Sequence, residues 1–183
     1  MLIALVGTIR WLLFWVFRRN EIVKNIYPVF LLAIIFNSTT TAHAEGMCGA
    51  KEEAVFNCEL DRTTASLCEM KDTGVLTYRN GTMKKIDIEV SDSGSNKGNV
   101  FYFSNVPYAG GDEAHIRFSR AGYTYYFYDK TVKTDDGPEF SAGIIVYRGN
   151  KKISRKICSN DASIRQAAYS DITKEGYKNI ESQ

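Results

Sequence analysis

Histidine, tryptophan and proline are scarce in this chain of 183 residues, which contains two, two and three of them respectively. Both tryptophans and one histidine, His43, lie in the first 44 residues, so His115 is the one histidine after them. Catalysis needs a positioned base, a nucleophile or a metal, and zinc sites usually combine several histidines and cysteines. The four cysteines contain no CxxC pair. We therefore expect no metal and no cofactor, and we expect the protein not to be an enzyme.

An excess of one charge sign is also absent from the part of the chain after residue 44. The whole chain has 23 basic and 21 acidic residues, of which four basic and one acidic lie in the first 44, so 19 and 20 remain. Nucleic-acid binding depends on an excess of basic residues that neutralise phosphates. The balance therefore argues against nucleic acid and against an anionic membrane surface, and we expect the partner to be a protein or an envelope component.

A long hydrophobic run is missing, but a short one lies near the start. Residues 26–36 are apolar, too few to cross a bilayer comfortably, and Lys24 precedes them. Ala42, His43 and Ala44 then have the small-x-small form that a signal peptidase recognises. This predicts a signal peptide cleaved after Ala44 and a protein that is periplasmic or secreted.

A second apolar segment, residues 1–20, lies upstream of this signal and is interrupted by Arg10. Two interpretations are open. The segment could be a membrane anchor, in which case the protein touches the membrane through an uncleaved leader and is a tethered structural envelope protein. We favour the other, in which the true start is Val23 and the leader is residues 23–44. The predicted organisation is then a leader (1–44), a disulfide-tied β domain (45–160), and a short helix with a polar tail (161–183).

The four cysteines, Cys48, Cys58, Cys68 and Cys158, all follow the predicted cleavage point. An even number of cysteines in an exported domain indicates disulfides, here two, with three possible connectivities. Cys58 and Cys68 could face each other across a hairpin. We favour Cys58–Cys158 with Cys48–Cys68, because that pairing closes the longest loop.

Residues 114–130 have the clearest strand pattern in the chain. Apolar and polar positions alternate on both sides of Ala121-Gly122, where glycine permits a tight hairpin. The predicted pairs on one face are Phe118–Tyr125 and Ile116–Phe127. The pairs on the other face are Ser119–Thr124, Arg117–Tyr126 and His115–Tyr128. That second face must be either covered by another element or open to a partner.

Other short runs of alternating or β-branched residues predict the remaining strands. We expect them at residues 52–60, 65–70, 74–79, 84–90, 100–104, 139–148 and 151–158, with loops at 91–98, 105–113 and 131–138. We expect a bulged turn that sets Leu76 opposite Ile86, and a final hairpin that sets Val146 opposite Ile153 and Ile144 opposite Arg155. A helix is expected within residues 164–172, capped by Asp161, and residues 174–183 are expected to fray. The fold class is an antiparallel β-sandwich or small barrel of eight or nine strands with a short C-terminal helix.

Tyrosine and arginine dominate binding energetics at interfaces, and loops on a β scaffold are common recognition surfaces. The candidate binding residues are Tyr108, Asp112, His115, Arg117, Ser119, Tyr123 and Tyr126. Tyr126 has the alternative role of filling a second layer of the sandwich. An enzymatic alternative, a small hydrolase that modifies the cell wall, would use His115 with Asp112, and His115 could also pair with Ser119.

Several strings in the chain carry a resemblance to known proteins. The chain resembles small exported bacterial β-sandwich proteins whose function is unassigned, and the resemblance covers roughly residues 56–158. The strings that carry it are VFNC, SLC, LTYRNG, IRFSRAGYTYYFY, AGIIVYRGNK and KIC. The general layout is also similar to that of periplasmic lysozyme inhibitors, which insert a Ser-Gly-x-x-Tyr-type loop into the enzyme. The nearest string here is Ser119-Arg120-Ala121-Gly122-Tyr123, in which the glycine is displaced. The resemblance implies a disulfide-tied β fold and, in its narrowest form, lysozyme inhibition.

Overall fold

A computed structural model describes residues 45–180 of the chain, which belong to one compact unit. The predicted signal peptide, the cleavage after Ala44, the alternative start at Val23 and the upstream segment lie outside the described residues. Within residues 45–180, no helix has both the length and the apolar character that a membrane crossing requires.

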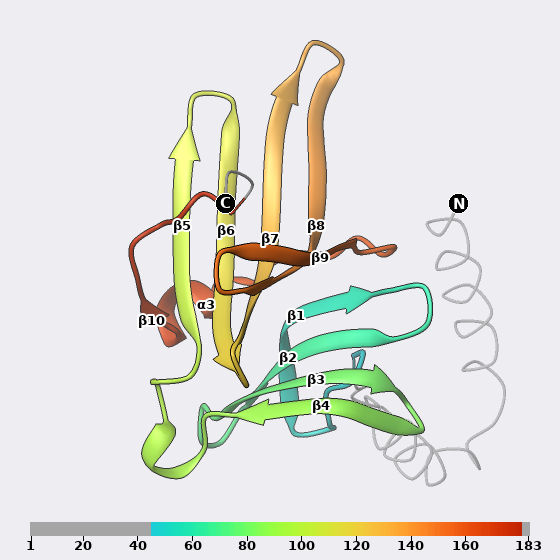
Figure 1. The fold of residues 1–183 in the computed structure, drawn as a ribbon, viewed down its shortest axis with the longest axis vertical. Helices are drawn as coiled ribbons and strands as arrows, with labels where there is room; N and C mark the ends of the chain where they lie inside the picture. The colour runs from blue at the N-terminus through green and yellow to red at the C-terminus, as the bar shows by residue number, and fades with distance from the viewer. Residues whose placement is uncertain (1–44, 181–183) are drawn as a thin grey trace, which may run out of the picture. The chain divides into compact units, whose positions relative to one another are not determined.

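The fold is an all-β sandwich of two sheets, as the sequence predicts (Figure 1). The four-stranded sheet contains β1 (Glu52–Glu59), β2 (Thr64–Met70), β3 (Leu76–Thr82) and β4 (Lys85–Ser91), in that order. The six-stranded sheet contains, in spatial order, β10 (Thr173–Lys174), β5 (Tyr102–Tyr108), β6 (Gly111–Arg120), β7 (Tyr123–Thr134), β8 (Gly137–Arg148) and β9 (Lys151–Ile157). All pairs are antiparallel except the short pair of β10 with β5.

Aromatic side chains from both sheets fill the core. Phe56 of β1 stacks on Phe127 of β7 with ring centroids 5.4 Å apart. Tyr78 of β3 packs against Phe118 of β6 at 5.0 Å. Each fully buried side chain of this size stabilises the fold by roughly 1.5–3 kcal/mol, and aromatic pairs add to that figure. These contacts fix the two sheets against each other.

The β6–β7 hairpin has the predicted register throughout. Phe118 lies opposite Tyr125 and Ile116 opposite Phe127, and the three pairs of the other face are also as predicted. Ala121 and Gly122 both have positive φ, at 50° and 79°. A two-residue turn with that backbone matches the right-handed twist of the strands that it joins.

Both disulfides have the favoured connectivity. Cys48 pairs with Cys68, 20 residues away, and Cys58 pairs with Cys158, 100 residues away. Disulfides persist in oxidising compartments and are rare in the cytosol. The two bonds therefore indicate a periplasmic or extracellular environment.

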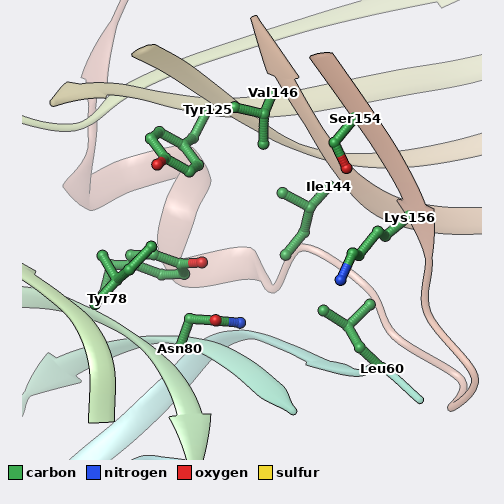
Figure 2. Close-up of a pocket in the computed structure, with 9 residues that line it drawn as sticks. Leu60, Tyr78, Asn80, Tyr125, Ile144, Val146, Ser154 and Lys156 are labelled. Carbon is green, nitrogen blue, oxygen red and sulfur yellow. The ribbon is translucent and has the colours of Figure 1, made fainter. Parts of the chain in front are cut away.

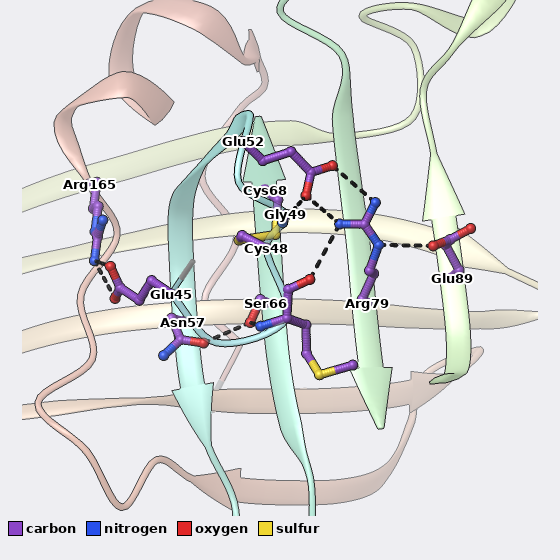
Figure 3. The surroundings of a disulfide bond; sticks show 11 residues. Glu45, Cys48, Gly49, Glu52, Asn57, Ser66, Cys68, Arg79, Glu89 and Arg165 are labelled. Atoms are coloured by element: carbon purple, nitrogen blue, oxygen red, sulfur yellow. Dashed lines mark hydrogen bonds and ion pairs between the residues drawn. A yellow bond between two sulfur atoms is a disulfide. The ribbon is translucent and has the colours of Figure 1, made fainter. Parts of the chain in front are cut away.

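The first disulfide lies beside an ion-pair network (Figure 3). The Arg79 guanidinium contacts both carboxylate oxygens of Glu52, at 2.7 and 3.0 Å, and one oxygen of Glu89 at 2.9 Å. Burial alone would raise the pKa of Glu52, but hydrogen bonds from Arg79 and from the Gly49 N–H outweigh burial and lower it. The network fastens the start of β1 to β3 and β4, and the hydrogen bond from Gly49 ties the preceding segment to it.

Two stretches expected to be irregular, residues 105–113 and 131–138, are strand instead. β5 continues to Tyr108 and pairs Pro107 with Asp112, while β7 and β8 stay paired as far as Thr134 and Gly137. Residues 105–113 contain a proline and two glycines, and residues 131–138 are mostly polar, so neither stretch has the apolar alternation that marks a half-buried strand. Pro107 is tolerated because β10 pairs only with Tyr102 and Phe103, which leaves the outer edge of β5 unpaired at residue 107.

Bulges shift two of the expected registers. In the β3–β4 hairpin a bulge is present as expected, but Gly81 lies opposite Ile86. Leu76 N–H donates to the Asp92 carboxylate, and Asp92 N–H donates to the Leu76 carbonyl. In the β8–β9 hairpin a bulge falls between Val146 and Tyr147, which moves every later pair by one position.

The second bulge accounts for a basic side chain that fits no apolar pair. Arg155 lies opposite Ile145, so it is on the face away from the core, with its guanidinium 5.6 Å from the centre of the Tyr128 ring. The expected pairs Val146–Ile153 and Ile144–Arg155 are therefore wrong, and Val146 lies opposite Ser154 instead. A shift of one residue exchanges the two faces of a strand, and this is what happens to β9.

The expected helix is present but short. It is α3 (Gln166–Asp171), and its N-cap residue is Arg165, which makes no side-chain capping bond, so the expectation of Asp161 as the cap is wrong. Ala168 and Ile172 pack into the core. The Ile164 N–H donates a hydrogen bond to the Asp129 carboxylate at 2.9 Å. The helix therefore anchors the chain before β10.

Candidate binding site

The predicted binding residues do not form one site, because the strands spread them over three places. Tyr108 and Asp112 lie at one end of the β5–β6 hairpin, and Ser119 and Tyr123 lie at the opposite end of β6, beside the turn. The other three, His115, Arg117 and Tyr126, lie between these ends on the face away from the core.

That middle face is covered by residues 173–180, which we call the C-terminal segment. Arg117 bonds the Glu175 carboxylate through Nε at 2.8 Å and Nη2 at 2.6 Å. The Tyr147 hydroxyl donates to the backbone carbonyl of Ile180 at 2.5 Å, and Ile180 is 1% exposed. The expectation that these residues fray is wrong through residue 180. Of the two alternatives for the second face, the structure has the covered one.

His115 is enclosed beneath this segment. Its ring is 1% exposed, stacks on Tyr177 with centroids 5.1 Å apart, and places Nε2 2.5 Å from Oε1 of Glu113. Lys130 Nζ lies 3.4 Å from the other oxygen of Glu113. Burial alone would raise the pKa of Glu113, but the hydrogen bond from His115 and the charges of His115 and Lys130 lower it. His115 Nδ1 is buried without a partner among the described residues.

The proposed hydrolytic set is not assembled by this geometry. Asp112 and His115 are three residues apart on β6, so their side chains lie on opposite faces of the sheet. Ser119 shares the face of His115, but four residues of strand separate them by about 13 Å. Within residues 45–180, no group of three histidine, cysteine or acidic side chains is placed to hold a metal ion.

The β5–β6 and β7–β8 hairpins extend beyond the four-stranded sheet (Figure 1). We call their outer part, residues 105–112 and 131–140, the hairpin platform. The Tyr108 hydroxyl donates to the Thr131 carbonyl at 2.8 Å, which ties the first hairpin to the second. Thr131 also lies opposite Asp112 on one side and Phe140 on the other. The platform is thus a continuous paired surface.

Phe140 is the feature of the platform that sequence reasoning missed. Its side chain is 71% exposed although its strand is paired along its whole length. The alternation of β8 puts Phe140 on the same face as the buried Ala142 and Ile144, so the pattern suggests a core residue. Only the length of the hairpins carries it past the edge of the other sheet. Exposed aromatic side chains on rigid strands are typical anchors for a partner.

A pocket opens between the sheets on the side of β9 (Figure 2). Its volume is about 100 Å³, and it is lined by Leu60, Tyr78, Asn80, Ile88, Tyr125, Ile144, Val146, Ser154 and Lys156. Pockets for whole small-molecule ligands are roughly 300–1,000 Å³, so this one suits a single side chain. Lys156 supplies the charge in the lining, and burial raises the pKa of the Tyr78 hydroxyl.

The geometry therefore offers two surfaces suited to binding: the hairpin platform with Phe140, and the pocket beside β9. The buried polar cluster at His115 serves the packing of the C-terminal segment. Comparisons of the chain with protein-family models, with curated proteins and with solved structures found no match.

Proposed function

We propose that this protein is an exported, non-enzymatic binding protein of the bacterial envelope, periplasmic or secreted, which contacts a protein or envelope component through its hairpin platform. The observation that carries the proposal is Phe140, a 71% exposed aromatic on a strand held by pairing and by the Tyr108–Thr131 hydrogen bond. A rigid aromatic loses little conformational entropy on binding, which makes it an efficient anchor.

Three further features support this function. The disulfides suit a protein that works outside the cytosol. Asp112 and Lys133 lie on the platform strands beside Thr131 and Pro138 and offer polar contacts around the aromatic anchor. His115, the residue best suited to acid-base chemistry, is enclosed and held by Glu113, which favours binding over hydrolysis.

Site-specific photocrosslinking in the native host tests the proposal. A photoreactive phenylalanine at position 140 is expected to give a discrete adduct in the exported fraction. The matched control is the same group at Met83, which is 81% exposed in the β3–β4 turn and lies on the other sheet. Adducts at both positions in equal yield, or none at position 140, would contradict the platform as the binding surface.

Three assays on the same material test the remaining alternatives. A lysozyme inhibition assay tests the narrower function that the resemblance implies. Loss of inhibition in Tyr123→Ala would assign that function to the β6–β7 turn in place of the hairpin platform. N-terminal sequencing of the native protein distinguishes a cleaved, released protein from one tethered by residues 1–20. A hydrolytic activity that His115→Ala abolishes, with the fold intact, would replace binding by the enzymatic alternative.

A further inference from the structure

β9 is the last strand of the six-stranded sheet and pairs on one side only, with β8, among the described residues. Most of its residues are exposed, namely residues 151, 153, 155, 156 and 157. An edge strand presents a row of backbone N–H and C=O groups that an extended segment of another chain can pair with. Most edges are protected from such pairing, so the question is which segment this edge would accept.

The charge of the chain around β9 favours an acidic segment. Residues 148–160 contain five basic side chains and no acidic one. The five are Arg148, Lys151, Lys152, Arg155 and Lys156. This is a local excess within a domain that is otherwise nearly neutral. An acidic segment would be attracted to this edge, whereas a basic one would be repelled.

The pocket favours an aliphatic side chain in that segment. Ser154 and Lys156 of β9 line it, and Figure 2 shows both side chains directed to the pocket from the strand that forms its side. A strand added to β9 would lie about 4.8 Å away with alternate side chains on the same face as Ser154 and Lys156. An aliphatic side chain of that strand would meet Leu60 and Ile144 at the mouth of the pocket. The Lys156 ammonium would meet a neighbouring carboxylate.

The opposite face of β9 suits the same kind of segment. Ile153 and Ile157 are 48% and 61% exposed there. They offer apolar contacts to side chains on the other face of an added strand. A second copy of this chain is a poor occupant, because antiparallel pairing of β9 with itself would place basic residues opposite one another, which is destabilising.

We propose that β9 binds an extended acidic segment of another protein by strand addition, with one aliphatic side chain of that segment in the pocket beside Ser154 and Lys156. The proposal goes beyond the function above, because it concerns a different surface and states the chemistry of its ligand. It stands if crosslinking at Phe140 fails, and it can fail while the platform binds a partner.

The test uses the exported protein purified from full-length expression and a short labelled peptide in which pairs of glutamates alternate with pairs of aliphatic residues, so that each face of the extended peptide carries both kinds of side chain. Fluorescence anisotropy measures binding, and backbone hydrogen exchange locates it. We expect saturable binding that protects β9, that weakens between about 0.05 M and about 0.5 M salt, and that is absent for the same peptide with lysine in place of glutamate.

Protein variants separate charge from fold. Lys151→Glu combined with Lys156→Glu is expected to weaken binding by more than about tenfold. The matched control is Lys51→Glu combined with Lys71→Glu, which makes the same charge change at exposed residues near the β2–β3 turn and is expected to bind normally. Ser154→Phe is expected to remove the preference for isoleucine over alanine in the peptide, because the larger side chain occupies the pocket. Thermal unfolding confirms that each variant is folded.

Two N-methylated peptides test strand addition itself. Alternate N–H groups of a strand point to the same edge, so methyl groups on one set of residues block pairing and methyl groups on the other set leave it intact. One of the two peptides is expected to lose binding and the other to keep it. Equal binding of both, equal binding of the lysine peptide, equal binding of an unrelated polyanion, or protection away from β9 would each overturn the proposal.

Discussion

The Cys58–Cys158 disulfide is expected to contribute more stability than Cys48–Cys68, because it closes a longer loop. Loop closure over 100 residues removes enough entropy from the unfolded chain to stabilise the fold by about 4.7 kcal/mol, and closure over 20 residues by about 3.3 kcal/mol. Replacing both cysteines of a pair by alanine should therefore lower the free energy of unfolding by these amounts. The difference between the two variants is about 1.4 kcal/mol.

The structure indicates why loss of the longer bond need not unfold the protein. Ser159 N–H donates to the Glu59 carbonyl at 2.8 Å, and the Asn160 side chain accepts from Glu59 N–H at 2.8 Å and donates to the Asn57 carbonyl at 3.1 Å. These bonds hold the end of β9 on β1 without the sulfurs. Domains of this size have a total stability of roughly 5–15 kcal/mol, so each variant is expected to remain folded near neutral pH.

Urea denaturation of the wild-type protein and of the two alanine pairs measures these values. The denaturant slopes are compared as well, because an unfolded chain without the cross-link exposes more surface. A larger loss for Cys48–Cys68 than for Cys58–Cys158 would refute the loop-length argument. No loss in either variant would show that the bonds are absent from the native protein and would remove the support for an oxidising compartment.

Three further predictions follow from contacts described above. The pKa of Glu113 is lowered from its ordinary value of 4.5, so its contribution to stability is complete above about pH 4.5 and is lost as the pH falls through the folded value. Glu113→Gln should therefore flatten the acid dependence of thermal unfolding measured from about pH 3 to about pH 7, and an unchanged profile would contradict this prediction. Truncation before Glu175 removes Ile180 and the ion pair with Arg117, so it should lower the free energy of unfolding by about 2–4 kcal/mol. The face that contains Tyr126 and Tyr128 would then be exposed and should bind more of a hydrophobic dye, whereas full stability would show that the C-terminal segment does not cover this face. A Cβ at Gly143 would lie 2.3 Å from the Lys156 carbonyl oxygen, so Gly143→Ala should lower the free energy of unfolding by about 1–3 kcal/mol and speed hydrogen exchange in β9. The control is Gly176→Ala, whose Cβ would meet no atom within 4 Å and which should change neither quantity.

The parts of the fold that the sequence predicted are those where one face of a strand is apolar. The β6–β7 hairpin is right at every pair because Ile116, Phe118 and Phe127 distinguish the buried face from the other one. The same logic fails on the hairpin platform, where polar Asp112, Thr131 and Lys133 occupy the face that is apolar further along the same strands. Backbone pairing alone holds those residues in strands, and backbone pairing leaves no trace in the side-chain pattern.

The candidate sites were harder to predict than the fold, for three physical reasons. The C-terminal segment is held by the Ile180 carbonyl and side chain, by the Glu175 ion pair and by the stacking of Tyr177 on His115, none of which a periodic pattern reveals. The pocket depends on the bulge that turns Ser154 and Lys156 inward and Arg155 outward. Phe140 shares its face with core residues, and only the relative lengths of two sheets decide that it is exposed.

The cover supplied by residues 173–180 has a consequence for how the protein matures. These residues are synthesised after every strand that they shield, so the aromatic layer of Tyr126, Tyr128 and Tyr147 stays bare while the sheet assembles. During that interval the nascent polypeptide exposes an aromatic surface to which holdase chaperones or neighbouring copies can bind. Efficient biogenesis therefore depends on how soon this last stretch arrives and docks.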